Sequence, residues 1–482
     1  MAAYALRTGQ NSMPELKKNQ EITLEITDLN NLGCGVGRYD GAVVFVRGAV
    51  SGDIVRAGII KVNKSYYVAR LIEILTPSPY RIGEGVCRAP ESCGGCVYRH
   101  ISYEYELTLK RELVKNAFHR AGLDDVEIAQ TESVGETRGY RNKAQFPVAR
   151  GRDGKLRAGI YASKTHDIVG GSDCMLQPPI FADIAEAICD FCNKKGIDAY
   201  DENTGKGLVR HIYLRRAEAT GQIMVCLVIN GDRIPDADEL CSALTVRFSD
   251  IHGILLNVNK KNTNVVLGDR FVTLWGEDTI EDILCGLRIK IAPAAFYQVN
   301  RRGAELLYGL AAQRAGENKQ GTLLDLYCGA GTIGLSMAHN FGRVVGIEIV
   351  PSAVECAREN AAQNGIENAY FSCGDASETG GLLARAEREL GQRIDAEVVI
   401  LDPPRKGTTP ELIEYISERD IKKVVYVSCD PVTLARDCAL FRQKGYEIGE
   451  VTPVDMFPRC GHVESVVSLT RGFDNELRKR MN

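Results

Sequence analysis

Alternation of apolar and polar positions organises the first part of the chain. Runs such as EITLEITDL, GAVVFVRGA and SYYVARLIEIL alternate apolar with polar residues and are separated by Gly, Asn and Asp turns. This period of two is typical of β-strands with one buried face. Five short strands at this spacing predict a small OB-like β-barrel over residues 15–77. A helical pattern follows at 103–122 and ends at Gly122.

The last part of the chain, from about residue 291, repeats the order strand, glycine turn, helix. Apolar strands that end in polar loops occur in TLLDLYCGAGTIG, RVVGIEIV, AEVVILDPP and KVVYVSCDP. This order predicts an α/β fold with a doubly wound, Rossmann-like sheet that binds ligands at the carboxyl ends of its strands. We therefore predict a barrel domain at 15–77, a mixed α+β central domain at 78–290 and the doubly wound domain at 291–482.

Composition narrows the class of protein without deciding it. The 482 residues carry a net charge of −4 and 25 % charged side chains, which is ordinary for a globular protein and unlike a histone. The sequence has neither a signal-peptide core nor an apolar run of membrane-spanning length. Sixteen cysteines in a reducing compartment would not form a disulfide framework. We expect a cytoplasmic protein without a membrane segment.

Acidic residues and glycines at the predicted strand ends indicate a cofactor pocket. Asp325 ends the first strand of the doubly wound domain and is followed by a glycine turn that includes Gly329. Such glycines let the backbone approach a ligand where a helix begins. Glu348 ends the second strand, where a carboxylate suits a ribose diol, and Asp375 follows the third, where it can face an adenine edge. These residues fit a nicotinamide dinucleotide and a methionine-derived cofactor about equally.

The fourth strand separates these two cofactor classes. It ends in ILDPPRKG, where Asp402 begins a rigid Pro-Pro turn that hydride transfer does not require. In methyltransferases of this layout, an acidic residue followed by prolines marks the substrate edge of the pocket. The motif therefore favours a methyltransferase over an NAD-dependent oxidoreductase.

Two further residues near strand ends can carry chemistry. Cys429 follows the strand VVYVS, and we expect the polar loop and the helix start behind it to lower the pKa of the thiol. The alternative for Cys429 is a buried structural cysteine. Glu464 interrupts the apolar strand VESVV, which suits a general base or an edge carboxylate that faces water.

A thiolate together with a carboxylate base suits methylation of uracil at carbon 5. This carbon is a poor nucleophile until a thiolate adds to C6 and turns the ring into an enolate. A base must afterwards remove the C5 proton so that the thiolate can leave. Cys429 and Glu464 would fill these two roles.

Five segments resemble, in order, the motifs of the RNA uracil-5-methyltransferase family: IAPAAFYQVN, DLYCGAGTIG, LDPPRKG, VSCDP and DMFPRCGHVE. The resemblance extends over nearly the whole chain, and the barrel looks like a TRAM domain, an RNA-binding module. It implies S-adenosylmethionine as cofactor, Cys429 as nucleophile and Glu464 as proton acceptor. The cofactor contacts that it implies lie at Gln298, Tyr327, Glu348 and Asp402. Long members of the family that methylate large-subunit ribosomal RNA share this layout.

A cysteine-rich loop predicts a metal site. Cys87, Cys93 and Cys96 stand close together in VCRAPESCGGCVYRH, and Cys174 is the best candidate for a fourth ligand. This spacing leaves zinc and an iron–sulfur cluster open. The family resemblance favours a [4Fe-4S] cluster.

Basic residues indicate RNA as the partner. Eight Lys or Arg and a single Asp fall within residues 138–164. Three aromatic residues interleaved with them can stack on bases: Tyr140, Phe146 and Tyr161. The segment RHIYLRR adds three arginines: Arg210, Arg215 and Arg216.

The expected substrate is a uridine that is unstacked or flipped, because only then can its ring reach Cys429. We expect a monomer that acts on 23S ribosomal RNA, since the barrel and the cysteine-rich loop accompany the doubly wound domain. The alternatives are a tRNA uracil-5-methyltransferase and a non-catalytic iron–sulfur protein that binds RNA.

Overall fold

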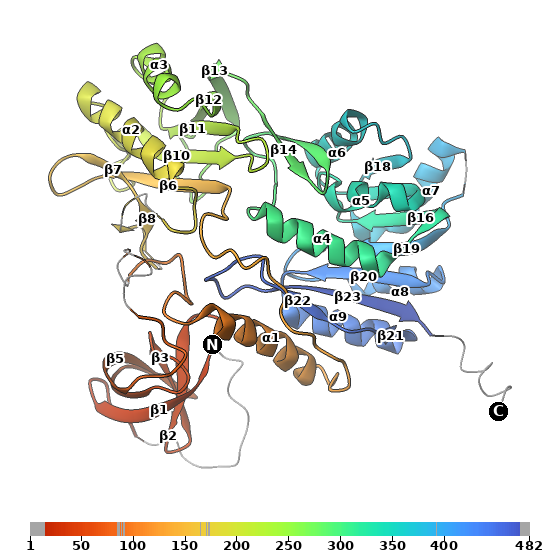
Figure 1. Ribbon diagram of the computed structural model, residues 1–482, viewed down its shortest axis with the longest axis horizontal. Helices are drawn as coiled ribbons and strands as arrows, with labels where there is room; N and C mark the ends of the chain where they lie inside the picture. The colour runs from red at the N-terminus through yellow and green to blue at the C-terminus, as the bar shows by residue number, and fades with distance from the viewer. Residues whose placement is uncertain are drawn as a thin grey trace. The chain divides into compact units, whose positions relative to one another are not determined.

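The structure is a computed structural model that describes residues 15–83, 87, 89, 92–163, 165–169, 171, 174–391 and 393–472 (Figure 1). Its contacts divide the chain into two compact units. The first unit combines residues 1–88, 95–113 and 457–462, and the second combines 89–94, 114–456 and 463–482. Among the described residues, no helix is both long and apolar enough to span a bilayer.

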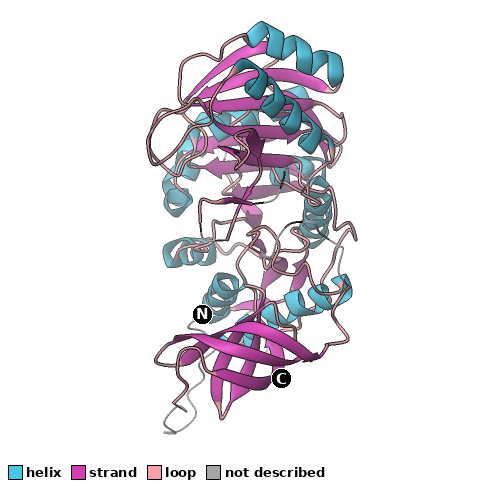
Figure 2. Ribbon diagram, turned by 90° about the vertical axis from the view of Figure 1, so that its left-hand side faces the viewer, coloured by secondary structure: helices cyan, strands magenta, loops and turns pink. Residues whose placement is uncertain are grey.

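A closed five-stranded barrel forms the core of the first unit, with the strand order β1-β2-β3-β5-β4. Its strands are β1 (Glu21–Leu29), β2 (Cys34–Tyr39), β3 (Ala42–Arg47), β4 (Ile54–Val62) and β5 (Tyr66–Thr76). Alternate residues of β1 point inward, so Ile22, Leu24 and Ile26 are buried while Thr23 and Glu25 between them face solvent. The barrel predicted from the period-two pattern is confirmed, and Figure 2 shows its strands in magenta.

Helix α1 (Tyr103–Arg120) follows the barrel, and its two halves belong to different units. Leu109, in the first half, packs in a small apolar cluster with Tyr98 and Ile101. Val114 and Phe118, in the second half, pack in the largest core of the second unit. One helix is therefore continuous through both units.

A six-stranded sheet in the second unit has the order β13-β12-β11-β10-β6-β7. Its strands are β6 (Lys143–Arg150), β7 (Leu156–Ala158), β10 (Val209–Arg216), β11 (Ile223–Ile229), β12 (Ile251–Val258) and β13 (Arg270–Gly276). Helices α2 (Ile180–Lys195) and α3 (Ala237–Arg247) share its apolar core. Two short antiparallel pairs are separate from it: β8 (Ile160–Tyr161) with β9 (Ile168–Val169), and β14 (Ile280–Leu284) with β15 (Leu287–Ile291).

The third sheet has eight strands and contains the parallel set that the glycine-turn pattern predicts. Its path is β18-β17-β16-β19-β20-β23-β21, with β22 paired to β23. The parallel strands are β16 (Asn318–Leu326), β17 (Phe341–Glu348), β18 (Ala369–Cys373), β19 (Ala396–Leu401) and β20 (Lys423–Ser428). The antiparallel strands are β21 (Tyr446–Ile448), β22 (Thr452–Val454) and β23 (Glu464–Arg471).

The connections of this sheet reverse direction beside β16. The chain runs outward from β16 to β17 and β18, then returns to place β19 and β20 on the other side of β16. Ligands of such sheets bind at this switch point, outside the carboxyl ends of the strands. The helical segments around it are α4 (Arg301–Ala315), α5 (Thr332–Ser336), η2 (Ala338–Asn340), α6 (Pro351–Gln363), η3 (Ala376–Glu378), α7 (Thr379–Leu390), α8 (Pro410–Glu418) and α9 (Pro431–Gln443). The predicted doubly wound α/β fold is confirmed.

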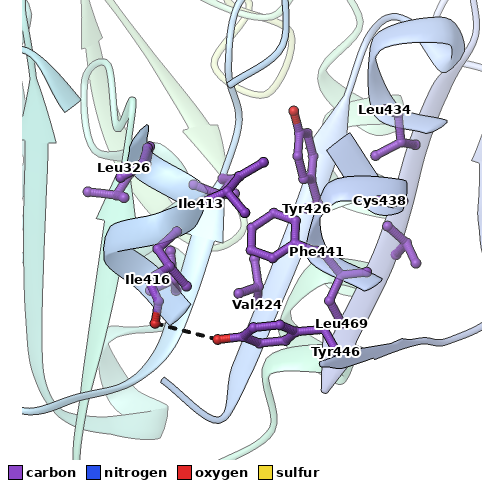
Figure 3. Packing of buried hydrophobic residues seen from close by; sticks show 14 of the residues in the cluster. Leu326, Ile413, Ile416, Val424, Tyr426, Leu434, Cys438, Phe441, Tyr446 and Leu469 are labelled. Atoms are coloured by element: carbon purple, nitrogen blue, oxygen red, sulfur yellow. Dashed lines mark hydrogen bonds between the residues drawn. The ribbon is translucent and has the colours of Figure 1, made fainter. Parts of the chain in front are cut away.

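Apolar packing fixes the strands that end at the switch point. Figure 3 shows Ile413 and Ile416 of α8 packed with Phe441 of α9 and Tyr426 of β20. The Tyr446 hydroxyl donates to the carbonyl oxygen of Ile421 at 2.7 Å, so the ring is buried without an unpaired polar atom. Each fully buried side chain of this size contributes about 1.5–3 kcal/mol.

Candidate active site

The glycine turn after β16 is shaped by two carboxylates. Asp325 is fully buried, and its Oδ2 accepts a hydrogen bond of 2.9 Å from the Gly334 amide, while its Oδ1 has no partner among the described residues. The Gly329 amide donates to Glu348 Oε2 at 3.1 Å. Gly331 has φ +76°, and a Cβ there would lie 3.0 Å from the Phe371 ring. Only glycine fits this position, which keeps the turn open above the strand ends.

The other predicted cofactor residues lie on loops around the same switch point. Tyr327 follows β16 directly, with φ +64°, and its hydroxyl lies 3.2 Å from Thr408 Oγ1. Gln298 precedes α4, and its carbonyl oxygen accepts from Asn142 Nδ2 at 2.8 Å. Asp375 follows β18 and is exposed. The structure thus places Tyr327 and Asp402, which follows β19, on adjacent strands of the sheet.

Cys429 and Glu464 lie opposite each other across two paired strands. The antiparallel register of β20 and β23 runs from Lys423↔Thr470 to Ser428↔Ser465. The next pair in this register is Cys429 with Glu464. Directly opposite residues of an antiparallel pair have Cα atoms roughly 4.5–5.5 Å apart and side chains on the same face. The thiol and the carboxylate therefore meet at the carboxyl end of β20.

Burial and neighbouring carboxylates make this site unfavourable for negative charge. Burial raises the pKa of Glu464 to about 8, with a further contribution from the charge of Asp402. Burial also raises the pKa of Asp402 to about 7. Desolvation, then the charges of Glu464 and Asp402, raise the pKa of Cys429 to about 11. The guanidinium of Arg405 acts in the opposite direction on both Cys429 and Glu464.

The expected lowering of the Cys429 pKa is therefore wrong. Helix α9 does begin behind the cysteine, but the Asp430 carboxylate caps it and accepts from the amides of Val432 at 2.9 Å and Thr433 at 3.1 Å. The cap occupies the helix end that was expected to favour a thiolate. Desolvation of the thiol, together with the charges of Glu464 and Asp402, outweighs the opposing effect of Arg405.

Two supporting residues, Asp437 and Arg405, escaped the sequence-based analysis, and a third, Arg215, was predicted to contact RNA instead. Asp437 is fully buried on α9 and accepts from the Thr408 amide at 2.9 Å and from the Tyr426 hydroxyl at 2.6 Å. It fixes the 402–408 loop that carries Arg405, a residue present in the DPPRKG motif but not singled out. Arg215 donates to the carbonyl oxygen of Ala292 at 3.4 Å, in the segment that leads to Gln298.

Several of the side chains that were predicted to contact RNA are buried. Tyr140 is 4 % exposed and Phe146 is 1 % exposed, so neither ring can stack on a base. Arg210 and Arg215 are buried as well, because β10 lies between β6 and β11 and its arginines bond to backbone carbonyls. Among the described residues of the basic stretch, the exposed cations are Arg138, Arg150, Arg152, Lys155 and Arg157. Composition alone does not show which of these side chains the fold buries.

Phe296 offers an apolar surface that the basic stretch lacks. It is 78 % exposed and stands two residues before Gln298. An exposed aromatic ring next to a polar pocket is typical of a surface that stacks on a base or a planar ligand.

The four predicted metal ligands are divided between the two units. Cys87 and Cys96 belong to the first unit, and Cys93 and Cys174 belong to the second. Within the described residues, no group of three or more His, Cys, Asp or Glu side chains is arranged to hold a metal ion. The [4Fe-4S] cluster therefore stays a prediction from the sequence.

The fold and this site define a class, the Rossmann-like methyltransferases with a cysteine opposite a carboxylate. Comparison with known proteins gives the family. Residues 259–472 match the tRNA (Uracil-5-)-methyltransferase family model, and residues 15–72 match the TRAM domain model. An uncharacterized RNA methyltransferase of Clostridium acetobutylicum is 41 % identical over 459 residues, which cover 95 % of this chain and 98 % of that protein. The chain belongs to the RNA uracil-5-methyltransferase family.

Two further relatives agree along almost the full length. An uncharacterized RNA methyltransferase of Listeria innocua is 41 % identical to this chain. The match covers 94 % of this chain and 98 % of the Listeria protein. The crystal structure of Pyrococcus abyssi tRNA (uracil-54, C5)-methyltransferase in complex with S-adenosyl-L-homocysteine aligns with a TM-score of 0.74 at 26 % identity. That alignment covers 93 % of this chain and all of the other.

The raised pKa of Cys429 predicts slow alkylation at neutral pH. Iodoacetamide reacts with the thiolate, so the rate at Cys429 should rise about tenfold per pH unit between pH 7 and 9. Glu464→Gln removes a charge that opposes the thiolate and should speed the reaction roughly two- to tenfold at pH 9, with less effect at pH 7. Arg405→Gln should slow it. Mass spectrometry of the Cys429 peptide gives these rates.

Cys429→Ala identifies the peptide signal and serves as the control. A Cys429 rate that is already constant between pH 7 and 9 would show a low thiol pKa and contradict the electrostatics described above.

Proposed function

We propose that this protein methylates carbon 5 of a uridine in RNA with S-adenosylmethionine, through a covalent bond between Cys429 and C6 of the ring. The observation that carries the proposal is the β20–β23 register, which ends at Ser428↔Ser465 and, continued by one residue, brings Cys429 opposite Glu464 at the carboxyl ends of the parallel strands. Membership in the uracil-5-methyltransferase family supports the reaction type.

In the proposed reaction the Cys429 thiol loses its proton to solvent, Sγ bonds to C6, and the ring electrons move toward C5 and O4. S-adenosylmethionine, when bound, would supply the methyl group to which C5 bonds, and S-adenosylhomocysteine would be the leaving group. Glu464 then accepts the C5 proton, the C5–C6 double bond re-forms, and the Sγ–C6 bond breaks to release Cys429. A base with a pKa of about 8 suits this proton transfer near neutral pH, because its conjugate acid is neither too strong nor too weak.

The switch point fits the proposed cofactor. The unpartnered Oδ1 of Asp325 and the open turn at Gly331 provide a polar cradle for a charged, amine-containing ligand. We propose that Gly329 and Glu348 hold the ribose and Asp375 the adenine edge. Gln298, Tyr327 and Asp402 would then orient the reactive end toward Cys429.

The barrel and the exposed cations support an RNA substrate. We propose 23S ribosomal RNA, because the long family members that modify it share this layout, and keep tRNA as the second candidate. The tRNA candidate rests on the similarity to the Pyrococcus abyssi enzyme. The alignment with that enzyme covers 93 % of this chain, so it must include residues of the barrel. The barrel therefore does not separate the two substrates.

Substitution of the two reacting residues should stop the reaction at different points. Cys429→Ala removes the nucleophile and should reduce methylation to background, a loss of more than about 10³-fold. Glu464→Gln keeps the size of the side chain but cannot accept the C5 proton. We expect it to accumulate a methylated RNA–protein adduct, visible as a retarded band on a denaturing gel with radiolabelled S-adenosylmethionine.

Full activity of Cys429→Ala would refute the covalent mechanism. As a control, Cys438→Ala alters a buried cysteine of α9 that lies outside the proposed site and should leave no adduct. An adduct that forms in Cys429→Ala would assign the nucleophile to another residue.

Mapping of 5-methyluridine in a deletion strain separates the two substrates. Loss of the modification from 23S ribosomal RNA, restored by the wild-type gene but not by Cys429→Ala, supports the proposal. Loss confined to tRNA would identify the protein as a tRNA methyltransferase that uses the same chemistry.

The cysteine-rich loop predicts iron in the protein as isolated. Anaerobic preparations should contain about four irons per chain, and Cys96→Ser should lower that content. Cys189→Ser is a matched control, because Cys189 and Cys192 share the x2 spacing but lie buried on α2. Stoichiometric zinc without iron would refute the cluster.

A further inference from the structure

Three cations lie together where strand β6 begins and strand β10 ends. In the register of these strands, Lys143 stands directly opposite Arg215. Directly opposite residues of an antiparallel pair have side chains on one face, with Cβ atoms about 4.5–5.5 Å apart. Arg141 lies two residues before Lys143, and its Nε donates to the Tyr140 hydroxyl at 3.3 Å. We call Arg141, Lys143 and Arg215 the β6 cation group.

The β6 cation group has positive charge in excess. Arg215 is 5 % exposed, and its guanidinium donates to neutral oxygens, which belong to Tyr213, Ala292 and Ala295. The half-buried Lys143 has neither an ion pair nor a side-chain hydrogen bond among the described residues. Burial lowers the pKa of Lys143, and the charges of Arg215 and Arg141 lower it further. Like charges placed opposite each other in a sheet destabilise it, so this arrangement suits an anionic ligand.

The same residues hold the loop of residues 292–299, which we call the Gln298 loop. The Tyr213 hydroxyl donates to the carbonyl oxygen of Pro293 at 2.7 Å. Asn142, which stands between Arg141 and Lys143, donates through Nδ2 to the carbonyl oxygen of Gln298 and through its amide to that of Val299, both at 2.8 Å. All of these residues belong to the second unit. The β6 cation group is therefore fixed next to the loop that carries Gln298.

The strand that carries Lys143 is accessible at this end. Strand β7 pairs with β6 from Val148↔Ala158 to Arg150↔Leu156, so this pairing does not extend to the first residues of β6. Gln145, which lies on the same face as Lys143, is exposed. A ligand can therefore approach Lys143 along this edge of the strand.

We propose that Lys143, together with Arg141, binds a backbone phosphate of the RNA next to the target uridine. This inference rests on the proposed function and names a part of its RNA site. A nucleotide that leaves its stack keeps the phosphates of the backbone beside it, and one of them would supply the charge that the β6 cation group lacks. Arg215 contributes its charge, while its donors stay on the Gln298 loop.

The salt dependence of RNA binding tests this site. The probe is a short synthetic RNA that surrounds the uridine mapped in the deletion strain, and Cys429→Ala protein binds it without forming an adduct. Lys143→Met keeps the apolar stem and removes the charge. We expect about tenfold weaker binding at roughly 0.1 M salt, and a fall of about 0.7 in the slope of log affinity against log salt concentration, because one cation fewer is released. Lys143→Arg should keep the original slope.

The stability of the RNA-free protein should change in the opposite direction. Lys143→Met removes the repulsion within the β6 cation group, so the melting temperature should rise by roughly 1–3 °C. A lower melting temperature together with unchanged RNA binding would assign Lys143 a structural role and overturn the proposal.

Two controls separate this site from other sources of charge. Lys155→Met makes the same change at an exposed lysine of the basic stretch, and it should keep the salt slope and weaken binding less than about twofold. The carboxylate of the cofactor is a second anion that Lys143 could bind. Calorimetry with S-adenosylhomocysteine should therefore give the same affinity for Lys143→Met as for the protein with Lys143.

An unchanged salt slope in Lys143→Met, or an equal loss in Lys155→Met, would overturn the proposal. So would a loss of S-adenosylhomocysteine binding with unchanged RNA binding, because the anion would then be the cofactor carboxylate. Failure of the proposed function itself would look different, since the deletion strain would then lack no 5-methyluridine in any RNA.

Discussion

The antiparallel pairing of β20 with β23 is the interaction on which the site depends. The five parallel strands bring their loops to one edge of the sheet, but the final strand runs the other way. Its first residue, Glu464, therefore lies at the same edge as Cys429, which directly follows β20. A parallel final strand would place the two residues at opposite edges of the sheet. A shift by one residue would turn the carboxylate to the other face.

The electrostatics of the site follow from this geometry. Desolvation is the largest effect on Asp402, Glu464 and Cys429, and the charge of Asp402 further raises the pKa of Glu464 and of Cys429. Such a site is poor at holding a free thiolate and well suited to proton transfer, because the carboxylate titrates near neutral pH. Arg405 is the cation that offsets this effect, and its loop is fixed by the buried Asp437.

Local patterns in the sequence were sufficient for the fold, and they supplied the candidate site residues, whose roles stay predictions. The period-two runs predicted the barrel, and the strand–glycine–helix order predicted the doubly wound sheet, because both depend on which residues of a single segment must be buried. Motifs at strand ends predicted Cys429, Glu464, Glu348 and Asp402 for a similar reason. The carboxyl ends of parallel strands always meet at one edge, whatever the details of packing.

Properties that depend on distant segments could be known only from the tertiary structure. The pKa of Cys429 was predicted in the wrong direction, because its nearest charges come from β19 and β23 rather than from its own loop. Arg210 and Tyr140 were predicted to contact RNA, but both are buried. A local sequence pattern does not show whether a second layer of the fold covers a polar side chain. The hydrogen bond from Lys110 to the carbonyl oxygen of Phe457 joins residues that are 347 positions apart in the sequence. No local pattern can indicate such a contact, since only the folded chain brings the two residues together.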